Sequence, residues 1–489
     1  MPVVMGVDSS TQSCKVELYD ADSGAFLGAG TAPHPPTTPP VSEQHPDDWW
    51  QALRLGLGRA IADAGVRAHD IMAMSVAAQC HGLVLMDNAG RVLRPVKLWN
   101  DLTSAPEAAA MVHQTGPGFW ADAVGSVPTA AFTITKLAWV ARHEPGVLAQ
   151  AGPACLPHDW LTWRLCHEFV TDRSEASGTG YYAGWDNVYR RDLLERFAGV
   201  GPDLRLPQVL GPDTPAGRIA PDLADDLGLS RDLVVGPGAG DQHAAALGLG
   251  LAPGDVAFSL GTSGVVMSVS DAPVHDRHGF VDGVCDATGR YLPLVCTLNA
   301  AKVTDWFRHL FGLSYDQFDE LALSVPADQR TVTMAAFLDG ERRPDLPYAT
   351  GLLGGLTTAT TTAQLARAIV DGVVMGLLEG LDALRRCGIL TDGRIIATGA
   401  AANSAAYRQS LADFLGHPVC LPATHDATAR GAALQATAIL TNSPIDQVRD
   451  AWLPPLAQTT EPSGAVPDEV RAAYHRLAAF RGLDRVEST

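Results

Sequence analysis

The segment with the clearest catalytic potential is Gly236–His243, which reads GPGAGDQH. An apolar stretch at 233–235 precedes it and an alanine-rich stretch follows, so a strand is expected to lead into a helix here. Because glycine has no side chain, a substrate could closely approach the carboxylate of Asp241. Such a carboxylate can accept a proton from an attacking hydroxyl group. The alternative is that Asp241 is the N-cap of the helix, and the two roles can coexist.

A loop near the N-terminus combines a carboxylate with several hydrogen-bonding groups. Strands are expected at 3–7 and 15–19, with a turn at 8–13 between them. In an apolar setting the carboxylate of Asp8 needs a partner, and a bound cation would supply one. The residues that follow could surround a phosphate with hydroxyl and N–H groups: Ser9, Ser10, Thr11, Gln12 and Ser13. A plain hairpin turn is the alternative, because Asp and Ser favour turns.

The second half of the chain opens with a similar element. Strands are expected at 256–260 and 265–269, joined by Gly261, Thr262, Ser263 and Gly264. Glycines allow the backbone to approach an anion closely and to donate N–H groups to it, although a tight turn without a ligand is an equal alternative. One such loop in each half favours a nucleotide held in a cleft between two related domains.

Three further segments place polar or small residues directly after predicted strands. Gln79, Cys80 and His81 lie between strands expected at 71–77 and 83–87, and their polar groups suit a hydroxylated ligand; a structural role for His81 is the alternative. Trp99, Asn100 and Asp101 follow a strand at 95–98 and add an apolar plate suited to a sugar. In the second half, Gly399, Ala400 and Asn403 follow a strand at 394–398, where small residues leave room for a flat ring such as adenine.

The elements that would position these residues predict an α/β fold. Apolar stripes predict helices at 46–64, from Leu365 to Leu384 with a stop near Gly388, and around Tyr407 with an end at Gly416. Strands alternate with these helices along the chain. A glycine-rich run at 245–254 is expected to contain the boundary between domains at 1–248 and 249–489.

The composition restricts the class of protein further. The chain has 489 residues, 46% of them apolar, and 35 Lys and Arg against 54 Asp and Glu give a net charge of −19. This length favours two domains, and the apolar content excludes a mainly disordered chain. The acidic balance argues against nucleic acid as a partner. A phosphate ligand would have to be held by backbone N–H groups, hydroxyls and metal ions rather than by side-chain cations.

Missing patterns exclude several other classes. No apolar run approaches the ~20 residues needed to span a bilayer, and the opening MPVVMGVDSS lacks the features of a signal peptide. The eight cysteines are scattered without C-x-x-C, which predicts reduced thiols in a cytoplasmic protein. The sequence contains no P-loop, no G-x-S-x-G and no H-E-x-x-H motif.

Taken together, these segments resemble the FGGY family of carbohydrate kinases. The resemblance extends roughly over residues 2–440 and rests on an ordered series of motifs: MGVDSSTQSCK, SVAAQCHGLVLMDNAGRVLRPVKLWND, FTITKLAWV, LPHDWLTWRL, FVTDRSEASGTGYY, GAGDQHAAALGLG, VAFSLGTSGVV, GERRP and ATGAAANSAAYRQSLADFLGHPV. It implies an actin-like (ribonuclease H-like) α/β fold of two related domains, with ATP and a sugar in a central cleft. It also implies Mg²⁺ and no nucleic acid or membrane partner, and a homodimer is compatible with it.

The resemblance assigns roles position by position. Asp241 resembles the general base and Asp8 the carboxylate of the first phosphate loop, which places both near Mg²⁺. The other expected contacts fall in four groups: Thr11, Gln12 and Ser13 in the first phosphate loop; Gly261, Thr262 and Ser263 in the second; Gly399, Ala400 and Asn403 in the adenosine loop; Gln79, Cys80, His81, Trp99, Asn100, Asp101 and Gln242 around the sugar.

The implied reaction is ATP-dependent phosphorylation of D-xylulose to D-xylulose 5-phosphate. Cys80 stands where the family commonly has Met and Gln242 where it often has Asn, which leaves the kinase class intact but weakens the assignment of the sugar. Ribulose, glycerol or another polyol are therefore alternative substrates. A remote alternative is an actin- or Hsp70-like ATPase; the polar loops at 79–82 and 99–101 argue against it.

Overall fold

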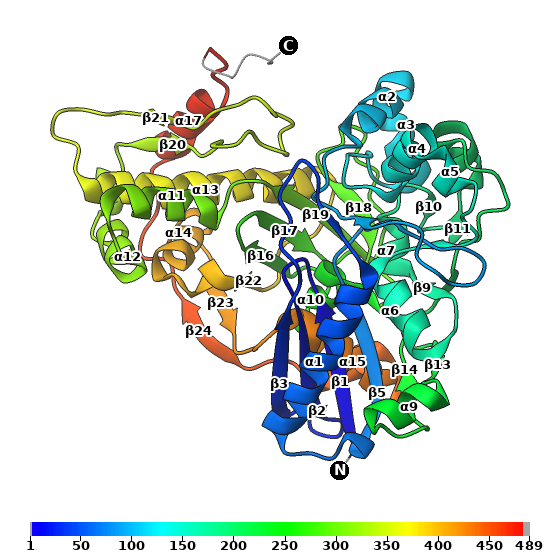
Figure 1. Cartoon of the computed structure of the whole chain (residues 1–489). Coiled ribbons are helices and arrows are strands. Elements are labelled where there is room, and N and C mark those ends of the chain that lie inside the picture. The colour runs from blue at the N-terminus through cyan, green and yellow to red at the C-terminus, as the bar shows by residue number, and fades with distance from the viewer. Residues whose placement is uncertain (1, 483–489) are drawn as a thin grey trace. The chain divides into compact units, whose positions relative to one another are not determined.

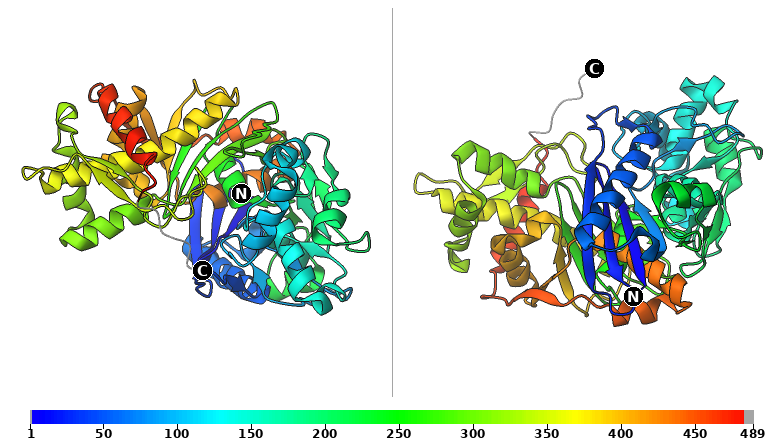
Figure 2. Two further views of the ribbon diagram at one scale, coloured as in Figure 1. Left: turned by 90° about the horizontal axis from the view of Figure 1, so that it is seen from above. Right: turned by 60° about the horizontal axis from the view of Figure 1, so that its bottom comes forward.

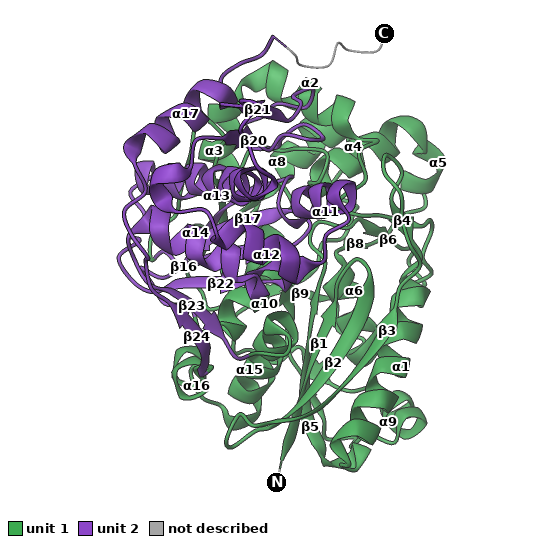
Figure 3. Ribbon diagram, turned by 90° about the vertical axis from the view of Figure 1, so that its left-hand side faces the viewer, with its two compact units in different colours: residues 1–250, 271–292, 424–454 green, residues 251–270, 293–423, 455–489 purple. Residues whose placement is uncertain are grey.

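The computed structural model describes residues 2–482, which form two compact units (Figure 3). Unit 1 comprises the described parts of 1–250, 271–292 and 424–454, and unit 2 those of 251–270, 293–423 and 455–489. Each unit therefore contains segments that are distant in the sequence. The domain boundary expected at 248 stays a prediction, because compactness alone does not define where a domain begins and ends.

A mixed sheet forms the centre of unit 1. Its strands are β1 (Val3–Ser9), β2 (Ser13–Asp20), β3 (Phe26–Pro33), β5 (Ile71–Ala78), β13 (Gly217–Arg218), β14 (Val234–Val235) and β15 (Ala239–Gly240). The order is β13-β14-β5-β1-β2-β3, and β15 pairs with the end of β5 (Figure 1). Strand β5 runs parallel to β1 and to β15, so the carboxyl ends of all three strands lie at one edge of the sheet.

The first strand is longer than its apolar run predicts. Strand β1 continues through Asp8 and Ser9, which pair with Lys15 and Cys14 of β2, so both residues belong to the strand and not to the turn. All seven residues of β1 are buried, which explains why an apolar pattern precedes the carboxylate. The prediction of a turn over 8–13 was wrong at its start, because ladder hydrogen bonds outweigh the turn preference of Asp and Ser.

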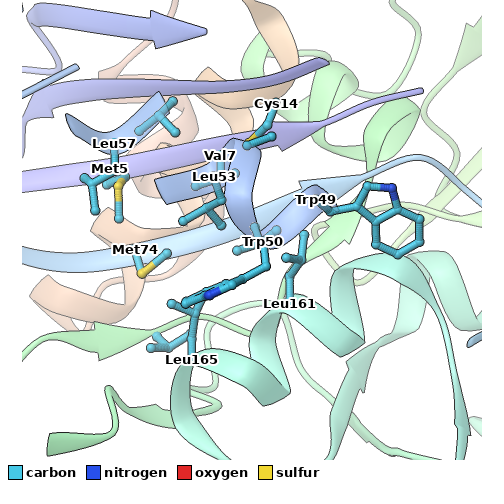
Figure 4. Packing of buried hydrophobic residues seen from close by; sticks show 14 of the residues in the cluster. Met5, Val7, Cys14, Trp49, Trp50, Leu53, Leu57, Met74, Leu161 and Leu165 are labelled. Atoms are coloured by element: carbon cyan, nitrogen blue, oxygen red, sulfur yellow. The ribbon is translucent and has the colours of Figure 1, made fainter. Parts of the chain in front are cut away.

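Helix α1 (Pro46–Ala64) covers β2 and β3 and confirms the predicted helix at 46–64. Figure 2 shows it in blue against the neighbouring blue strands. His45 caps its first turn, and Gly65 ends it with a left-handed φ of 64°. Trp50 and Leu53 of the helix pack with Met5 and Met74 of the sheet (Figure 4). Each such buried side chain contributes about 1.5–3 kcal/mol to folding.

Helices α10 (Asp241–Gly248) and α15 (Ala427–Thr441) cross at very short range. A Cβ on Gly431 would lie 1.8 Å from the carbonyl oxygen of Ala244, and one on Gly248 would lie 1.9 Å from that of Ala427. Sequence analysis identified no helix at 427–441, because this stretch of small residues is buried on nearly every side and shows no polar face. Its packing brings the N-termini of both helices to the sheet.

Shorter elements complete unit 1. Its other helical segments are η1 (Ala68–Asp70), α2 (Ala105–Thr115), α3 (Pro117–Val124), α4 (Thr133–His143), α5 (Pro145–Leu148), α6 (Pro157–Cys166), α7 (Arg173–Ser177), α8 (Arg191–Leu193), η2 (Leu194–Ala198), α9 (Pro221–Leu227) and α16 (Ile445–Ala451). Its other strands are β4 (Glu43–Gln44), β6 (Val84–Leu85), β7 (Val96–Lys97), β8 (Ala154–Cys155), β9 (Val170–Asp172), β10 (Tyr182–Ala183), β11 (Val188–Tyr189), β12 (Gln208–Leu210) and β18 (Asp282–Cys285). The strands predicted at 83–87 and 95–98 are thus reduced to two residues each.

Unit 2 is built on a sheet in the order β19-β17-β16-β22-β23-β24. Its strands are β16 (Val256–Leu260), β17 (Gly264–Ser268), β19 (Tyr291–Thr297), β20 (Thr333–Ala335), β21 (Leu352–Gly354), β22 (Ile395–Thr398), β23 (Val419–Pro422) and β24 (Leu456–Thr460). Its helical segments are α11 (Ala301–Phe311), α12 (Tyr315–Leu323), η3 (Ala327–Gln329), α13 (Thr362–Arg386), η4 (Ala400–Asn403), α14 (Ala405–Leu415) and α17 (Asp468–Ala478). The predicted strand at 256–260 and the helices ending near Gly388 and Gly416 are confirmed.

Two sequence-based exclusions can be compared with the fold. Across residues 2–482, no helix combines the length and the apolar character that crossing a bilayer requires. All eight cysteines lie within the described part of the chain, and none of them forms a disulfide bond there.

The close helix crossing generates a stability prediction. Gly431→Ala should lower the free energy of unfolding by about 1–3 kcal/mol, because its Cβ would press on the backbone of α10. Gly58→Ala is the matched control: it lies in α1 with no atom within 4 Å of the added Cβ, and should raise stability by about 0.5–1 kcal/mol. Urea unfolding measures both. Equal stability of Gly431→Ala and the wild type would contradict the close packing.

Candidate active site

Three carboxylates meet at the carboxyl edge of the unit 1 sheet. Asp8 ends β1, Asp241 begins α10 directly after β15, and Asp426 caps α15 by accepting from the N–H of Ala429 at 2.9 Å. The Nζ of Lys15 donates to Asp426 Oδ2 at 2.6 Å and lies 3.9 Å from Asp8 Oδ2. One cation thus faces the buried Asp8 and the partly buried Asp426, with Asp241 close by, an arrangement that suits a further cation.

Burial and repulsion by neighbouring acids raise the pKa of two of the three carboxylates, Asp8 and Asp241. Burial raises the pKa of Asp8 well above its usual range, and the negative charge of Asp426 raises it further; the hydroxyl of Ser10, which donates to Asp8 Oδ1, opposes the shift. Burial likewise raises the pKa of Asp241 to about 6. Asp426 was missed from the sequence, although an Asp directly before an alanine-rich run is a helix N-cap signal.

Asp241 is the first residue of α10, and the N-cap position belongs to Gly240. The alternative of Asp241 as a helix N-cap was therefore wrong by one residue. Its Oδ1 accepts from the backbone N–H of Gln242 at 2.7 Å and from the thiol of Cys80 at 3.4 Å. A carboxylate with a pKa of about 6 is largely ionised at neutral pH and yet basic enough to take a proton from a substrate hydroxyl.

The segment from Gln79 to His81 continues the parallel strand β5 beside Asp241. His81 adopts a left-handed φ of 65°, its N–H donates to Glu175 Oε1 at 2.5 Å, and its carbonyl accepts from Lys136 Nζ at 2.9 Å. The imidazole stacks on Phe132 with ring centroids 5.2 Å apart. His81 is therefore firmly positioned on three sides. Glu175 and Lys136 hold His81 in place, but no local sequence pattern pointed to either residue.

Trp99 and the first phosphate loop are linked directly. The indole N–H of Trp99 donates to Thr11 Oγ1 at 2.8 Å, and Gln44 Nε2 donates to the carbonyl of Thr11 at 2.9 Å. Gln79 Nε2 in turn donates to Gln44 Oε1 at 3.3 Å. The structure thus brings a predicted sugar residue and a predicted phosphate residue together through Gln44, which sequence analysis did not single out.

The other predicted residues of unit 1 range from fully buried to exposed. The carboxylate of Asp101 is fully buried and accepts from the N–H groups of Ser42 and Thr103 at 2.9 and 3.0 Å. It supports the loop internally, and its contact with a sugar stays a prediction. Asn100 and Gln242 are partly exposed, Gln12 is exposed, and Ser13 belongs to β2.

In unit 2 the two predicted nucleotide loops follow neighbouring parallel strands. Strands β16 and β22 pair with Ser259 opposite Thr398, so the loops after them, 261–263 and 399–403, start at the same edge. The carbonyl of Gly261 accepts from the N–H of Ala301, and that of Thr262 from the N–H of Ala300. These bonds fix the first loop to the start of α11 and leave the side chain of Thr262 exposed.

The loop at 399–403 depends on its glycine. Gly399 has a φ of 86°, and a Cβ there would lie 2.7 Å from the carbonyl oxygen of Leu260. Gly399, Ala400 and Asn403 are exposed, and Asn403 Nδ2 donates to the carbonyl of Ala400 at 3.2 Å. Ser404 then caps α14. The loop is thus short and exposed, and it follows a strand that neighbours the one before the predicted phosphate loop.

Solved structures with this architecture define the class of protein. The chain matches the crystal structure of xylulose kinase from Bifidobacterium adolescentis with a TM-score of 0.85 and 36% identity, over 97% of this chain and 99% of that one. It matches a kinase structure from Brucella ovis with a TM-score of 0.88 and 28% identity, over 97% of each chain. The α/β, actin-like fold expected from the sequence is thereby confirmed, and the class is that of a sugar-phosphorylating kinase.

Residues 3–248 match the N-terminal domain of the FGGY family of carbohydrate kinases, and residues 256–440 match its C-terminal domain. The chain belongs to this family. It is 41% identical to a xylulose kinase of Streptomyces coelicolor over 92% of this chain and 91% of that protein, and 39% identical to one of Streptomyces rubiginosus over the same shares. As a carbohydrate kinase it uses a sugar and ATP with a divalent metal ion, and the actin- or Hsp70-like ATPase is set aside.

Lys136, which supports His81, generates a prediction about stability and pH. Burial lowers the pKa of Lys136 to about 7 from the usual 10.5, so the folded protein binds fewer protons there than the unfolded chain between these values. Stability therefore rises with pH through this window, by at most about 1.4 kcal/mol per pH unit. Lys136→Met removes this contribution.

Urea unfolding of the wild type and Lys136→Met, compared from about pH 7 to pH 8.5, tests the shift. The stability of the wild type relative to the variant should increase as the pH rises. A constant difference across this range would contradict the neutralisation of Lys136. Lys302→Met, which removes a lysine on the surface of unit 2, is the control and should leave the slope unchanged.

Proposed function

We propose that the protein transfers the γ-phosphoryl group of ATP to the terminal hydroxyl of D-xylulose, giving D-xylulose 5-phosphate. The observation that carries this proposal is the partly buried Asp241 at the start of α10, with a pKa of about 6. The choice of sugar is supported by the xylulose kinases that are 41% and 39% identical over nearly the whole chain.

Asp241 acts as the general base in this proposal. It accepts the proton of the sugar hydroxyl as the oxygen attacks the γ-phosphorus, and the N–H of Gln242 and the thiol of Cys80 hold its Oδ1 in place. The sugar lies against Gln79, Cys80, His81, Trp99, Asn100, Asp101 and Gln242. Because Trp99 donates to Thr11 directly and Gln79 reaches it through Gln44, sugar binding and phosphate positioning are coupled.

The phosphates are held mainly by backbone N–H and hydroxyl groups. The proposed phosphate contacts of unit 1 are Thr11, Gln12 and Ser13, and those of unit 2 are Gly261, Thr262 and Ser263 at the γ-phosphate. Gly399, Ala400 and Asn403 receive the adenosine. Neither loop, 9–13 or 261–264, contains Lys or Arg. Loops of this kind bind anions through oriented backbone dipoles.

The divalent ion in this proposal is Mg²⁺, held by Asp8 and Asp241. The site fits a cation, because Asp8 is buried, repelled by Asp426, and faces the single ammonium of Lys15. Carboxylate oxygens are the ligands that Mg²⁺ prefers. When bound, the ion offsets negative charge on the phosphates.

The setting in which the enzyme acts is also part of the proposal. Eight cysteines that form no disulfide within the described residues, several of them buried, suit a reducing cytoplasm, where ATP and sugars are present. A homodimer remains a prediction, and light scattering of the purified protein measures it directly.

A base role for Asp241 predicts a loss of turnover without a loss of nucleotide binding. Asp241→Asn should lower kcat by about 10²–10⁴-fold, because the amide cannot accept the proton, while ADP binds through loops of unit 2. A coupled ADP-release assay and calorimetric titration with ADP measure the two effects. Asp222→Asn, in the exposed first turn of α9, is the control and should behave as the wild type. Turnover within about threefold of the wild type would refute the base.

A second sugar is the alternative specified by Cys80 and Gln242, which depart from the common family pattern. A panel of D-xylulose, D-ribulose, glycerol and other polyols in the same assay separates the candidates. D-xylulose should give the highest kcat/KM. If another sugar exceeds it by about tenfold or more, a difference of about 1.4 kcal/mol in transition-state binding, the carbohydrate kinase stands and the xylulose assignment fails.

A further inference from the structure

A second group of potential ligand atoms lies immediately behind Asp241. Cys80 follows β5, Glu175 lies in α7, and His243 lies in the first turn of α10. One ligand atom from each of these three residues lies within 4.8 Å of the other two. Glu175 and His243 are buried, with 0% and 2% of their surfaces exposed, and Cys80 is partly buried.

These polar atoms are incompletely satisfied. Among residues 2–482, neither Oε2 of Glu175 nor either ring nitrogen of His243 meets a hydrogen-bond partner. Buried polar groups normally have partners, and two of these atoms, Glu175 Oε2 and His243 Nδ1, lie on the same side of Gly240, where one ligand could contact both. His158 and Asp172 lie near both Glu175 and His243, and Asp241 lies beyond the thiol of Cys80. Lys136 and His81 also lie near Glu175.

Gly240 leaves the space between the three ligand atoms open. A Cβ at this residue would lie 2.3 Å from Glu175 Oε2, 2.5 Å from His243 Nδ1 and 2.7 Å from Cys80 Sγ. All three atoms thus converge on one face of the glycine, and a side chain of any other type would fill the space between them. The sequence therefore maintains an opening at the point where the donors meet.

The donor types select the kind of occupant. A thiolate, an imidazole and a carboxylate are the ligands of zinc and related cations, at distances of about 2.0–2.3 Å. Mg²⁺ prefers oxygen ligands and does not select a thiolate. We propose that Cys80, Glu175 and His243 bind a thiophilic divalent cation such as Zn²⁺, at a site distinct from the carboxylates of Asp8 and Asp426.

Binding of the cation is accompanied by proton release. The metal–sulfur bond replaces the S–H bond of Cys80, and the thiol proton, together with any proton on Glu175, passes to solvent.

Because the site is adjacent to Asp241, the proposed base, a bound cation should affect catalysis. The thiol of Cys80 donates to Asp241 Oδ1 at 3.4 Å, and a metal-bound thiolate has no proton to donate. The cation also adds positive charge beside Asp241, which lowers its ability to accept a proton. Zn²⁺ should therefore inhibit phosphorylation. This consequence rests on the proposed function, whereas cation binding does not.

Metal binding is tested on the full chain with Zn²⁺ as the probe, in competition with a chromophoric chelator and with Mg²⁺ in excess. One Zn²⁺ per chain should bind in the wild type, and Cys80→Ser and His243→Gln should each weaken binding by about tenfold or more. Cys420→Ser is the control, because Cys420 is free and partly buried like Cys80 but lies in β23, and it should bind as the wild type.

Two results would overturn the proposal: no stoichiometric binding by the wild type, or binding that Mg²⁺ abolishes and Cys80→Ser leaves unchanged. The second would assign the ion to the acidic residues instead. If a variant fails to fold, Co²⁺ titration of the wild type decides, because a thiolate–Co²⁺ bond gives a charge-transfer band that oxygen ligands cannot. Zn²⁺ binding without inhibition would leave the site intact and contradict the base role of Asp241.

Discussion

The parallel alignment of β1, β5 and β15 is the constraint on which the candidate active site depends. Parallel strands end at one edge, and this edge receives Asp8 from the first strand, Cys80 from the second and Asp241 from the third. A buried carboxylate is costly unless something compensates it. Lys15 is opposite Asp8 in the antiparallel ladder and reaches Asp426 at 2.6 Å, so the sheet supplies the compensating charge along with the acid.

Two helices complete this arrangement through a contact that only glycine permits. The crossing of α10 and α15 at Gly248 and Gly431 lets both helices begin at the sheet edge, which places Asp241 and Asp426 beside Asp8. The cost is electrostatic, since the three acids repel one another and burial raises the pKa of both Asp8 and Asp241. The repulsion between these acids lowers the stability of the fold. It also gives the site a carboxylate that can accept a proton near neutral pH and an affinity for cations.

A chain with a net charge of −19 can be a kinase because its phosphate ligand does not have to be bound by cationic side chains. Its predicted phosphate loops contain glycine, Ser and Thr, and the two loops of unit 2 follow paired parallel strands. Backbone N–H groups in such loops can bind an anion without a cationic side chain. The sugar is neutral, and a divalent ion reduces the charge of ATP. The excess of acidic residues therefore contributes to solubility without opposing the reaction.

Local patterns were sufficient for α1, for β16 and for the ends of the helices near Gly388 and Gly416, because stripes, alternation and caps are properties of neighbouring residues. The ordered series of motifs was also sufficient to predict the family and its fold. Tertiary packing alone decided that Asp8 lies inside a strand, that a small-residue stretch at 427–441 forms a buried helix, and that Asp426 and Glu175 belong beside Asp241 and Cys80. These contacts join segments up to about 400 residues apart, and no local preference encodes a hydrogen bond or a burial that exists only after the strands have paired.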